Sequence, residues 1–232
     1  MQIAGIQKTT LIDYPGKVAT TLFTLGCNMK CPYCHNKQIS FDFADTTVPM
    51  DIQDVFAFLD ERKGFIDAIS LSGGEPTLQP DLLDFCRTIK KKYNLLIKFD
   101  TNGSFPDVIK KAIDQGLVDY VALDIKTSFN RYKEYLGVDG ELIYKTYKII
   151  SGSGIDYELR MTCFPDFIDP ESVTELLPML HVKDRIFLQQ CYLNKSLGEP
   201  VYDVPTYDKA QMELFENLMN SKGFASASIR NK

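Results

Sequence analysis

Short apolar segments alternate with amphipathic segments along most of the chain. The apolar segments are rich in isoleucine, valine, leucine and phenylalanine, and they lie at residues 18–25, 66–71, 95–99, 120–125, 157–163 and 186–189. Such segments favour β-strands. Between them, apolar residues recur at helical spacing over residues 52–59, 82–89 and 108–113. This alternation predicts right-handed crossovers and a parallel sheet of the α/β class, either open or curled into a barrel.

Polar residues gather where the predicted strands end. They are the cysteines between residues 27 and 34, then Ser72, Gly73, Gly74, Glu75, Asp100, Thr101, Asn102, Asp124, Lys126, Arg160, Thr162, Gln189 and Gln190. Taken singly, each could belong to a turn or a structural ion pair. Together they favour a barrel, because the active sites of parallel barrels are built from the C-terminal ends of the strands. The expected fold is a partial (β/α)6 TIM-like barrel of parallel strands.

Three of the six cysteines form a compact motif. Cys27, Cys31 and Cys34 follow the first predicted strand in the order Cys-x3-Cys-x2-Cys. Thiolates are soft ligands that suit zinc, copper(I) or iron-sulfur clusters, and a [4Fe-4S] cube normally takes four of them. Three local cysteines would therefore leave one iron of a cube open to another ligand, as catalytic metal sites keep an open position.

Other interpretations of these cysteines remain open. Residues 31–35 also match the Cys-x-x-Cys-His pattern of haem attachment, a structural zinc site would need a fourth ligand, and a disulfide would need an oxidising compartment. The N-terminal residues show no export signal. Cys86, Cys163 and Cys191 are each isolated among apolar or aromatic neighbours, so we expect buried, inert thiols there.

Two further segments have both a binding and a structural interpretation. The glycines of residues 72–76 permit close approach of a ligand or a positive φ, and Glu75 can receive an ammonium group, but a tight turn closed by proline also fits. Residues 100–103 offer acceptors for ribose hydroxyls or a small cation, or an Asn-Gly turn. Arg160 could bind a carboxylate of a ligand or of the protein.

The bulk composition is that of a globular enzyme. The chain has 232 residues, 44% of them hydrophobic and 25% charged, which suits one domain, with a core at about residues 18–190 and an extension at 191–232 that contains a helix from 208 to 221. The net charge of -5 argues against a nucleic-acid surface. No apolar run approaches the ~20 residues that span a bilayer. We expect a cytoplasmic protein that binds neither nucleic acid nor membrane.

These motifs together resemble a known family. Residues 26–36 around the three cysteines, Gly73-Gly74-Glu75-Pro76, Asp100-Thr101-Asn102-Gly103 and Asp124-Ile125-Lys126 are similar to the radical S-adenosylmethionine superfamily, most of all to the activating enzymes of glycyl-radical proteins. The opening segment 11–17, together with Leu188-Gln189-Gln190, is similar to the branch that activates anaerobic ribonucleoside-triphosphate reductase. The resemblance extends from about Gly5 to Gln190.

The resemblance implies a role for each matching residue. Cys27, Cys31 and Cys34 would bind three irons of a [4Fe-4S] cluster, and the amino and carboxylate groups of S-adenosylmethionine would bind the fourth. The other implied contacts with S-adenosylmethionine are Tyr33 near the adenine, Gly73, Gly74 and Glu75 at the methionine amino group, Asp100, Thr101 and Asn102 near the ribose or a monovalent cation, and Asp124, Lys126 and Arg160. Related activators carry a histidine near the sixth strand, and Gln190 or another group would do its work here.

The implied activity is radical chemistry on a protein. The enzyme would cleave S-adenosylmethionine reductively to a 5'-deoxyadenosyl radical, which would take the Cα hydrogen of a glycine in a glycyl-radical enzyme, anaerobic ribonucleotide reductase in the matching branch. A flavodoxin- or ferredoxin-type donor would supply the electron, and no protein residue would act as a catalyst beyond the cluster and the cofactor. The alternative is a radical enzyme for a small molecule such as a 7-deazaguanine precursor.

Overall fold

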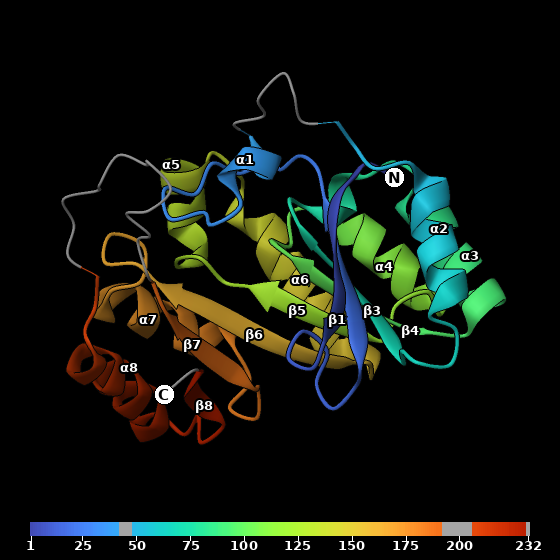
Figure 1. The fold of residues 1–232 in the computed structure, drawn as a ribbon. Helices are drawn as coiled ribbons and strands as arrows, with labels where there is room; N and C mark the ends of the chain where they lie inside the picture. The colour runs from blue at the N-terminus through green and yellow to red at the C-terminus, as the bar shows by residue number, and fades with distance from the viewer. Residues whose placement is uncertain (42–47, 192–205, 231–232) are drawn as a thin grey trace.

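The protein is built on one eight-stranded sheet whose strand order is the order of the sequence (Figure 1). The computed structural model describes residues 1–41, 48–191 and 206–230. The strands are β1 Ile3–Thr10, β2 Ala19–Thr24, β3 Ala68–Gly73, β4 Leu96–Thr101, β5 Tyr120–Asp124, β6 Asp156–Cys163, β7 Ile186–Gln190 and β8 Ala227–Arg230. From β2 to β8 every neighbouring pair is parallel.

The predicted fold class is confirmed, and the sheet has two strands more than the six predicted. All six predicted strands are present as β2 to β7. The additional β1 pairs antiparallel with β2, and the additional β8 pairs with β7. Sequence patterns missed β1 because its central residues are polar and partly exposed, and they missed β8 because it is only four residues long.

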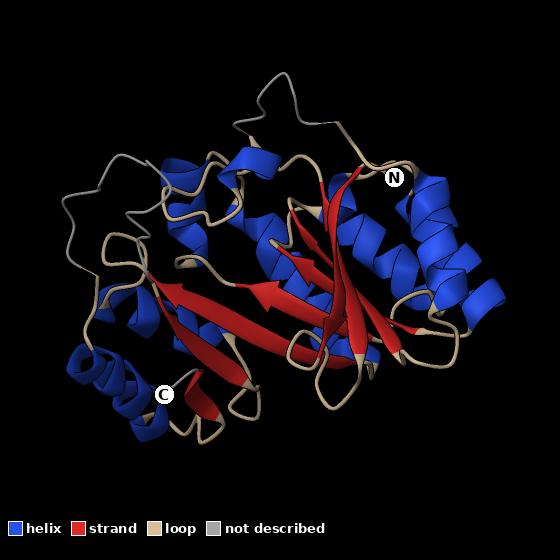
Figure 2. Ribbon diagram, viewed as in Figure 1, coloured by secondary structure: helices blue, strands red, loops and turns tan. Residues whose placement is uncertain are grey.

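Helices connect the strands and cover the outer face of the sheet (Figure 2). They are α1 Lys37–Ser40, α2 Ile52–Glu61, α3 Leu82–Tyr93, α4 Pro106–Asp114, α5 Tyr132–Leu136, α6 Gly140–Ser153, α7 Pro170–Leu176 and α8 Lys209–Ser221, with short 3-10 turns η1 Pro76–Leu78, η2 Phe129–Arg131 and η3 Leu177–Met179. The four helices predicted from periodicity are α2, α3, α4 and α8. Local signals explain their starts: Asp51 caps α2 by accepting from Gln53, and Pro106 opens α4.

The two faces of the sheet have opposite character. Alternate residues such as Leu71, Phe99 and Leu123 are fully buried on the outer face, in the main core beneath the helices. The inner face is polar over most of its length. A small cluster of Tyr14, Ala19, Ala68, Tyr120 and Ala122 fills its lower end, where the Tyr14 and Tyr120 rings lie 5.6 Å apart. The loop that follows β1 therefore plugs the bottom of the barrel and leaves the upper end open.

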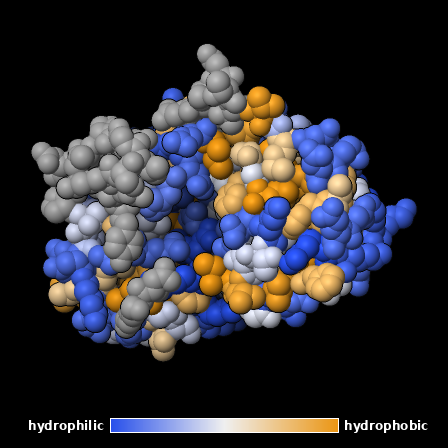
Figure 3. All heavy atoms as spheres, in the orientation of Figure 1, coloured by the Kyte–Doolittle hydropathy of each residue, from blue (hydrophilic) through white to orange (hydrophobic). Residues whose placement is uncertain are grey.

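The barrel is incomplete, since β1 and β8 are the two edges of the described sheet. Figure 3 shows a hollow lined by hydrophilic atoms on this open side, with hydrophobic atoms beside it in the region of β1 and β2. None of the described helices has the length and apolar character that crossing a membrane requires. Within the part of the chain that the structure describes, no strand closes the sheet between β1 and β8.

The C-terminal segment joins the same sheet. Helix α8 packs near β7 and β8, and Arg230 of β8 reaches the inner face, where its guanidinium donates to both carboxylate oxygens of Glu158 at 3.0 and 2.9 Å. Tyr120 donates to the same carboxylate at 2.8 Å. Residues 192–205 and 231–232 of the predicted extension lie outside the described residues.

Candidate functional site

A cavity of about 250 Å³ lies at the C-terminal ends of the parallel strands. It is lined by Cys27, Met29, Cys31, Tyr33, Cys34, His35, Asn36, Ser40, Ser72, Gly73, Gly74, Glu75, Asp100, Thr101, Asn102, Asp124, Lys126, Arg160, Thr162 and Gln189. Every residue that the resemblance assigned to a cofactor is among them, with the exception of Gln190. Residues far apart in sequence therefore converge because each directly follows or ends a parallel strand.

The cysteine loop is held over the cavity by backbone bonds to α1. Gly26, at a φ of +86°, turns the chain out of β2, and the Gly26 and Cys27 amides donate to the carbonyls of Ile39 and Ser40, both at 2.8 Å. The Cys34 amide donates to the Cys31 carbonyl at 3.1 Å. These bonds close the loop on itself, so all three thiols line one side of the cavity.

The thiols suit a cluster better than a single ion. Among the described residues no group of three or more His, Cys, Asp or Glu side chains is arranged to hold one metal ion. In a [4Fe-4S] cube each cysteine binds a different iron, so the sulfurs need not share one ion. Burial raises the pKa of the Cys27 thiol to about 11 and also raises the pKa of Cys31. Bound iron would have to stabilise these thiolates.

Gly73 and Gly74 are required by the packing of the protein against itself. Gly73 has a φ of +96°, and a Cβ there would lie 2.8 Å from the Phe23 backbone. A Cβ on Gly74 would lie 2.1 Å from the Gly26 carbonyl oxygen. The Glu75 amide donates to that same oxygen at 2.7 Å. The glycines therefore let the loop after β3 press against the start of the cysteine loop, which is the structural interpretation of this motif.

Glu75 clamps the ends of β3 and β4 together. Its carboxylate is 1% exposed and accepts four hydrogen bonds: from the Thr77 amide at 3.0 Å, the Thr77 hydroxyl, the Thr101 hydroxyl at 2.7 Å and the Asn102 amide at 2.7 Å. Burial raises the pKa of Glu75 in spite of these donors. The implied contact of Glu75 with a methionine amino group would add to bonds that the protein already makes.

Asn102 connects Glu75 to the cysteine loop. Its side-chain amide donates to the Asn28 side-chain oxygen at 3.0 Å and approaches the Cys27 sulfur at 3.7 Å. Asn28 in turn donates to the Ser104 hydroxyl at 2.9 Å. On the other side of the loop, Asn36 donates to the Gly73 carbonyl at 3.1 Å. Asn28 and Asn36 were not predicted as site residues, although Asn28 directly follows Cys27 and Asn36 stands two residues after Cys34.

Charged side chains form the floor of the cavity. Arg160 on β6 donates from Nε to Asp124 at 2.8 Å, and its Nη1 lies 3.3 Å from Asp100. Lys126 lies 3.3 Å from the other oxygen of Asp124, and Lys98 donates to Asp100. Despite burial, Arg160 and Lys98 lower the pKa of Asp100 to about 2. Lys98 was not predicted, although it stands two residues before Asp100 and therefore shares its face of β4.

Tyr33 and the glutamines complete the comparison with the expected site. Tyr33 packs on Phe164 and Phe167, and its buried hydroxyl has no hydrogen-bond partner among the described residues. An orphaned polar atom beside a cavity suits a ligand that supplies the missing partner. Gln189 lines the cavity, whereas the side-chain amide of Gln190 donates to the Tyr207 carbonyl at 2.8 Å.

Comparison with known proteins identifies the family. The model of the radical SAM superfamily matches residues 21–177, and the chain belongs to this superfamily. The crystal structure of QueE from Escherichia coli has the same fold, with a TM-score of 0.59 and 16% identity over 100% of this chain and 94% of that one. The resemblance seen in the motifs is therefore confirmed at the level of the superfamily and its fold.

Two curated relatives match over most of their length. The "Putative glycyl-radical enzyme activating enzyme MJ1227" of Methanocaldococcus jannaschii is 38% identical over 195 residues, which cover 81% of this chain and 79% of the relative. The pyruvate formate-lyase-activating enzyme of Clostridium pasteurianum is 28% identical over 177 residues, which cover 72% and 71%.

Membership of the superfamily implies an enzyme with a [4Fe-4S] cluster and S-adenosylmethionine as cofactors. The cavity fits this pair in its chemistry. Three thiols line one wall, an unpartnered phenol lies beside them, and a floor with both charge signs faces them. An amino acid with an ammonium, a carboxylate and a sulfonium needs partners of both signs.

Proposed function

We propose that this protein activates a glycyl-radical enzyme, with anaerobic ribonucleoside-triphosphate reductase as its partner. Cys27, Cys31 and Cys34 would hold the cluster, and the floor and walls of the cavity would hold S-adenosylmethionine. The cofactors supply reductive cleavage of the C5'-S bond to methionine and a 5'-deoxyadenosyl radical, which takes a hydrogen atom from the Cα of a glycine.

One observation carries the proposal: the three thiols of a radical SAM motif line the same cavity as the ends of β3 to β7. The thiols alone would serve an electron carrier. The polar residues of the strand ends give the cavity the means to bind a charged small molecule beside them. An electron-transfer module has no use for this second set of residues.

The chain's own residues bind, orient and exclude water. Arg160 and Lys126 present cationic groups from the floor of the cavity, and either can meet the carboxylate of the methionine part. Tyr33, buried against Phe164 and Phe167, offers its free hydroxyl. Glu75 and Asn102 hold the surrounding loops in place. A reactive radical needs such fixed surroundings, because it attacks whichever C-H bond lies next to it.

The shape of the barrel supports a protein substrate. No described strand closes the sheet between β1 and β8, and a hydrophilic hollow lies on that side (Figure 3). A loop that carries a glycine could enter through this opening. The activating enzymes among the curated relatives favour the same class of substrate, and the match of the opening segment 11–17 favours the reductase. We propose a flavodoxin- or ferredoxin-type protein as the electron donor and the cytoplasm as the location.

The test is anaerobic. The reconstituted, reduced protein is mixed with S-adenosylmethionine and an anaerobic ribonucleotide reductase, and the products are followed by paramagnetic resonance and chromatography. We expect a glycyl radical on the reductase together with 5'-deoxyadenosine. Cys31→Ala, which removes one cavity thiol, should give neither product, while Cys86→Ala, which removes a core thiol, should give both.

Two other outcomes would contradict parts of the proposed function. Formation of 5'-deoxyadenosine without a glycyl radical would reject the reductase as the partner and would direct the search to other glycyl-radical enzymes or to a small molecule such as a 7-deazaguanine precursor. Absence of both products from a protein that contains its cluster would reject the radical activity itself.

A further inference from the structure

Five charged side chains meet at the floor of the cavity, and they come from three different strands. Lys98 and Asp100 lie on β4, Asp124 and Lys126 on and just after β5, and Arg160 on β6. The side chains of Lys98, Asp100 and Arg160 are 3%, 13% and 14% exposed. Buried carboxylates need partners, and the nature of these partners decides what else can bind here.

A single guanidinium spans the gap between the two carboxylates. Arg160 lies 2.8 Å from Asp124 through Nε and 3.3 Å from Asp100 through Nη1, and both contacts are made to the Oδ1 atoms. Lys126 pairs with Oδ2 of Asp124 at 3.3 Å. Lys98 pairs with Oδ1 of Asp100. The space between Asp100 and Asp124, where two carboxylates could bind a metal cation, is thus filled by nitrogen donors of the protein.

We propose that Lys98, Arg160 and Lys126 take the place of a monovalent metal cation between Asp100 and Asp124, and that Lys98 positions Asp100 for the cofactor. The residues do not fit the monovalent cation that the family resemblance implies. The part of this inference that concerns the cofactor rests on the proposed binding of S-adenosylmethionine in the cavity. The part that concerns the cation stands on the geometry of the side chains.

The charge balance supports this substitution. Three cationic side chains face two carboxylates, and the next carboxylate on β6, Glu158, is paired with Arg230, so the group already carries one positive charge in excess. A further cation would have to displace the guanidinium from one oxygen of each carboxylate and remain close to two ammonium groups. Like charges a few ångströms apart in a poorly solvated interior repel one another strongly. Sodium or potassium is therefore excluded by charge as well as by space.

The contact of Lys98 with the cavity runs through Asp100. Lys98 is buried at the level of the Tyr120 ring, whose centroid lies 5.9 Å from its Nζ, and it does not line the cavity. Its ammonium fixes the Asp100 carboxylate from below while Arg160 approaches from β6. Lys98 is therefore a positioning residue for Asp100, and its removal should weaken cofactor binding without changing the cavity wall.

The first experiment measures cation binding directly. Sodium-23 relaxation is recorded on the reconstituted enzyme, and potassium is added as a competitor. We expect no saturable sodium site in the wild type. A saturable site that is lost in Asp124→Asn would overturn the proposal. This measurement needs neither S-adenosylmethionine nor a partner protein, so a failure of the proposed activity would leave its result intact.

The second experiment measures the affinity for S-adenosylmethionine by calorimetry in potassium chloride and in choline chloride at equal ionic strength. The wild type should change less than about twofold, because its counter-cations are covalently part of the chain. Lys98→Ala removes one ammonium and leaves room for an ion, so its affinity in choline should fall roughly tenfold and recover in part when potassium is added. A wild-type enzyme that itself requires potassium would reject the proposal.

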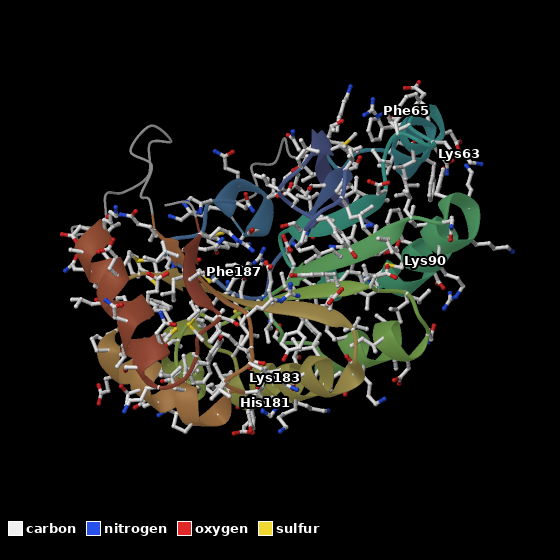
Figure 4. The ribbon with its side chains drawn as sticks, turned by 90° about the horizontal axis from the view of Figure 1, so that it is seen from below. Lys63, Phe65, Lys90, His181, Lys183 and Phe187 are labelled. Carbon is white, nitrogen blue, oxygen red and sulfur yellow. The ribbon has the colours of Figure 1, made fainter. Side chains whose placement is uncertain are left out.

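Two controls separate positioning from damage to the fold. Lys98→Arg keeps the charge and should retain most of the affinity. Lys90→Ala removes an ammonium that also pairs with an aspartate, Asp119, but from helix α3, and Figure 4 shows Lys90 at the opposite end of the sheet from Phe187. It should leave the affinity unchanged.

The pH dependence of S-adenosylmethionine binding distinguishes a positioning role from misfolding, because misfolding would not shift it. Asp100 is faced by Lys98 on its own strand, by Arg160 from β6 and by Ser72 from β3, with Asp124 nearby on β5. Arg160 and Lys98 lower its pKa to about 2. Without Lys98 that pKa should rise, and the acid limb of the affinity profile should move to higher pH. An unchanged acid limb in Lys98→Ala would show that Lys98 does not act through Asp100.

Discussion

The six cysteines divide into two sets of three with different surroundings. Cys27, Cys31 and Cys34 lie on one irregular loop and line the cavity at the top of the barrel. Cys86, Cys163 and Cys191 lie on or next to regular elements, and all three are fully buried in the main core, as the sequence predicted. All six are free thiols.

A raised thiol pKa occurs in both sets. Burial raises the pKa of Cys27 to about 11, of Cys191 to about 11, and of Cys86 and Cys163 to about 12. What differs is access, because the loop thiols face a cavity that a cluster could enter while the core thiols face packed side chains. A raised thiol pKa is thus compatible with iron binding where the metal itself can stabilise the thiolate.

The strongest test of this division is to remove one thiol from the loop. Cys31→Ala should abolish both cluster binding and cleavage of S-adenosylmethionine, since two cysteines cannot hold the three irons. Iron and sulfide analysis, visible absorption and formation of 5'-deoxyadenosine measure the loss. A variant with full iron content and full cleavage would remove the basis for assigning the loop to the cluster.

A second test asks whether the cysteine loop depends on the hydrogen bonds that Glu75 accepts beside it. Glu75→Ala leaves the Asn102 amide and two threonine hydroxyls without their acceptor, so the free energy of unfolding should fall by about 3 kcal/mol. Iron content should fall with it, because Asn102 also contacts the cysteine loop. Urea unfolding and iron analysis check this. Glu75→Gln, which keeps one acceptor oxygen, should lose less of both; an equal loss in Gln and Ala would contradict the clamp.

A third test uses pH to probe the charged floor. The pKa of Asp100 is lowered from its ordinary value of 3.8 to about 2, so its ionisation stabilises the folded state at neutral pH. This contribution, about 2 kcal/mol, should be fully present above pH ~4 and should disappear as the pH falls toward about 2. Unfolding free energies of wild type and Asp100→Asn should therefore converge over this interval. A constant difference between the two proteins would refute the assignment.

The smallest expected effect is in the core. Cys86→Ala leaves a small cavity and should lower the free energy of unfolding by about 1–2 kcal/mol without changing iron content or cleavage. Thermal unfolding and the assays above check this. Loss of iron from this variant would contradict the division between cluster-binding and core cysteines.

Much of the site could be predicted because its residues carry local signals. Cysteine spacing located the cluster loop, and period-two alternation placed Asp124 and Lys126 on one face, where they pair. Lys98 has the same period-two relation to Asp100 and was missed because a lysine inside an apolar strand pattern carries no motif of its own. Gln190 was predicted as a cofactor contact, but it does not line the cavity, whereas its neighbour Gln189 does. Adjacent residues of a strand point to opposite faces of the sheet, and sequence similarity alone did not distinguish between the two glutamines.

The strands inside the sheet were predictable from the sequence, and the strands at its two edges were less so. The six inner strands carry recognisable apolar positions because helices bury their outer face, even where their inner face is polar. Strands β1 and β8 have only one neighbour each, which permits polar residues and short length. The role of the glycines at 73 and 74 could be predicted only as a choice between a ligand and a turn, because the partner of their close approach, Gly26, is distant in sequence.

The strand order has a consequence for how the charged interior can form. Every strand pairs with the one that precedes it, so the sheet can grow in the order in which the chain is synthesised, without waiting for a distant segment. Strand β4 brings Lys98 together with Asp100, and β6 brings Arg160 together with Glu158. Each of these two strands thus brings a cation together with its own carboxylate, so each carboxylate can enter the inner face already accompanied by a counter-charge.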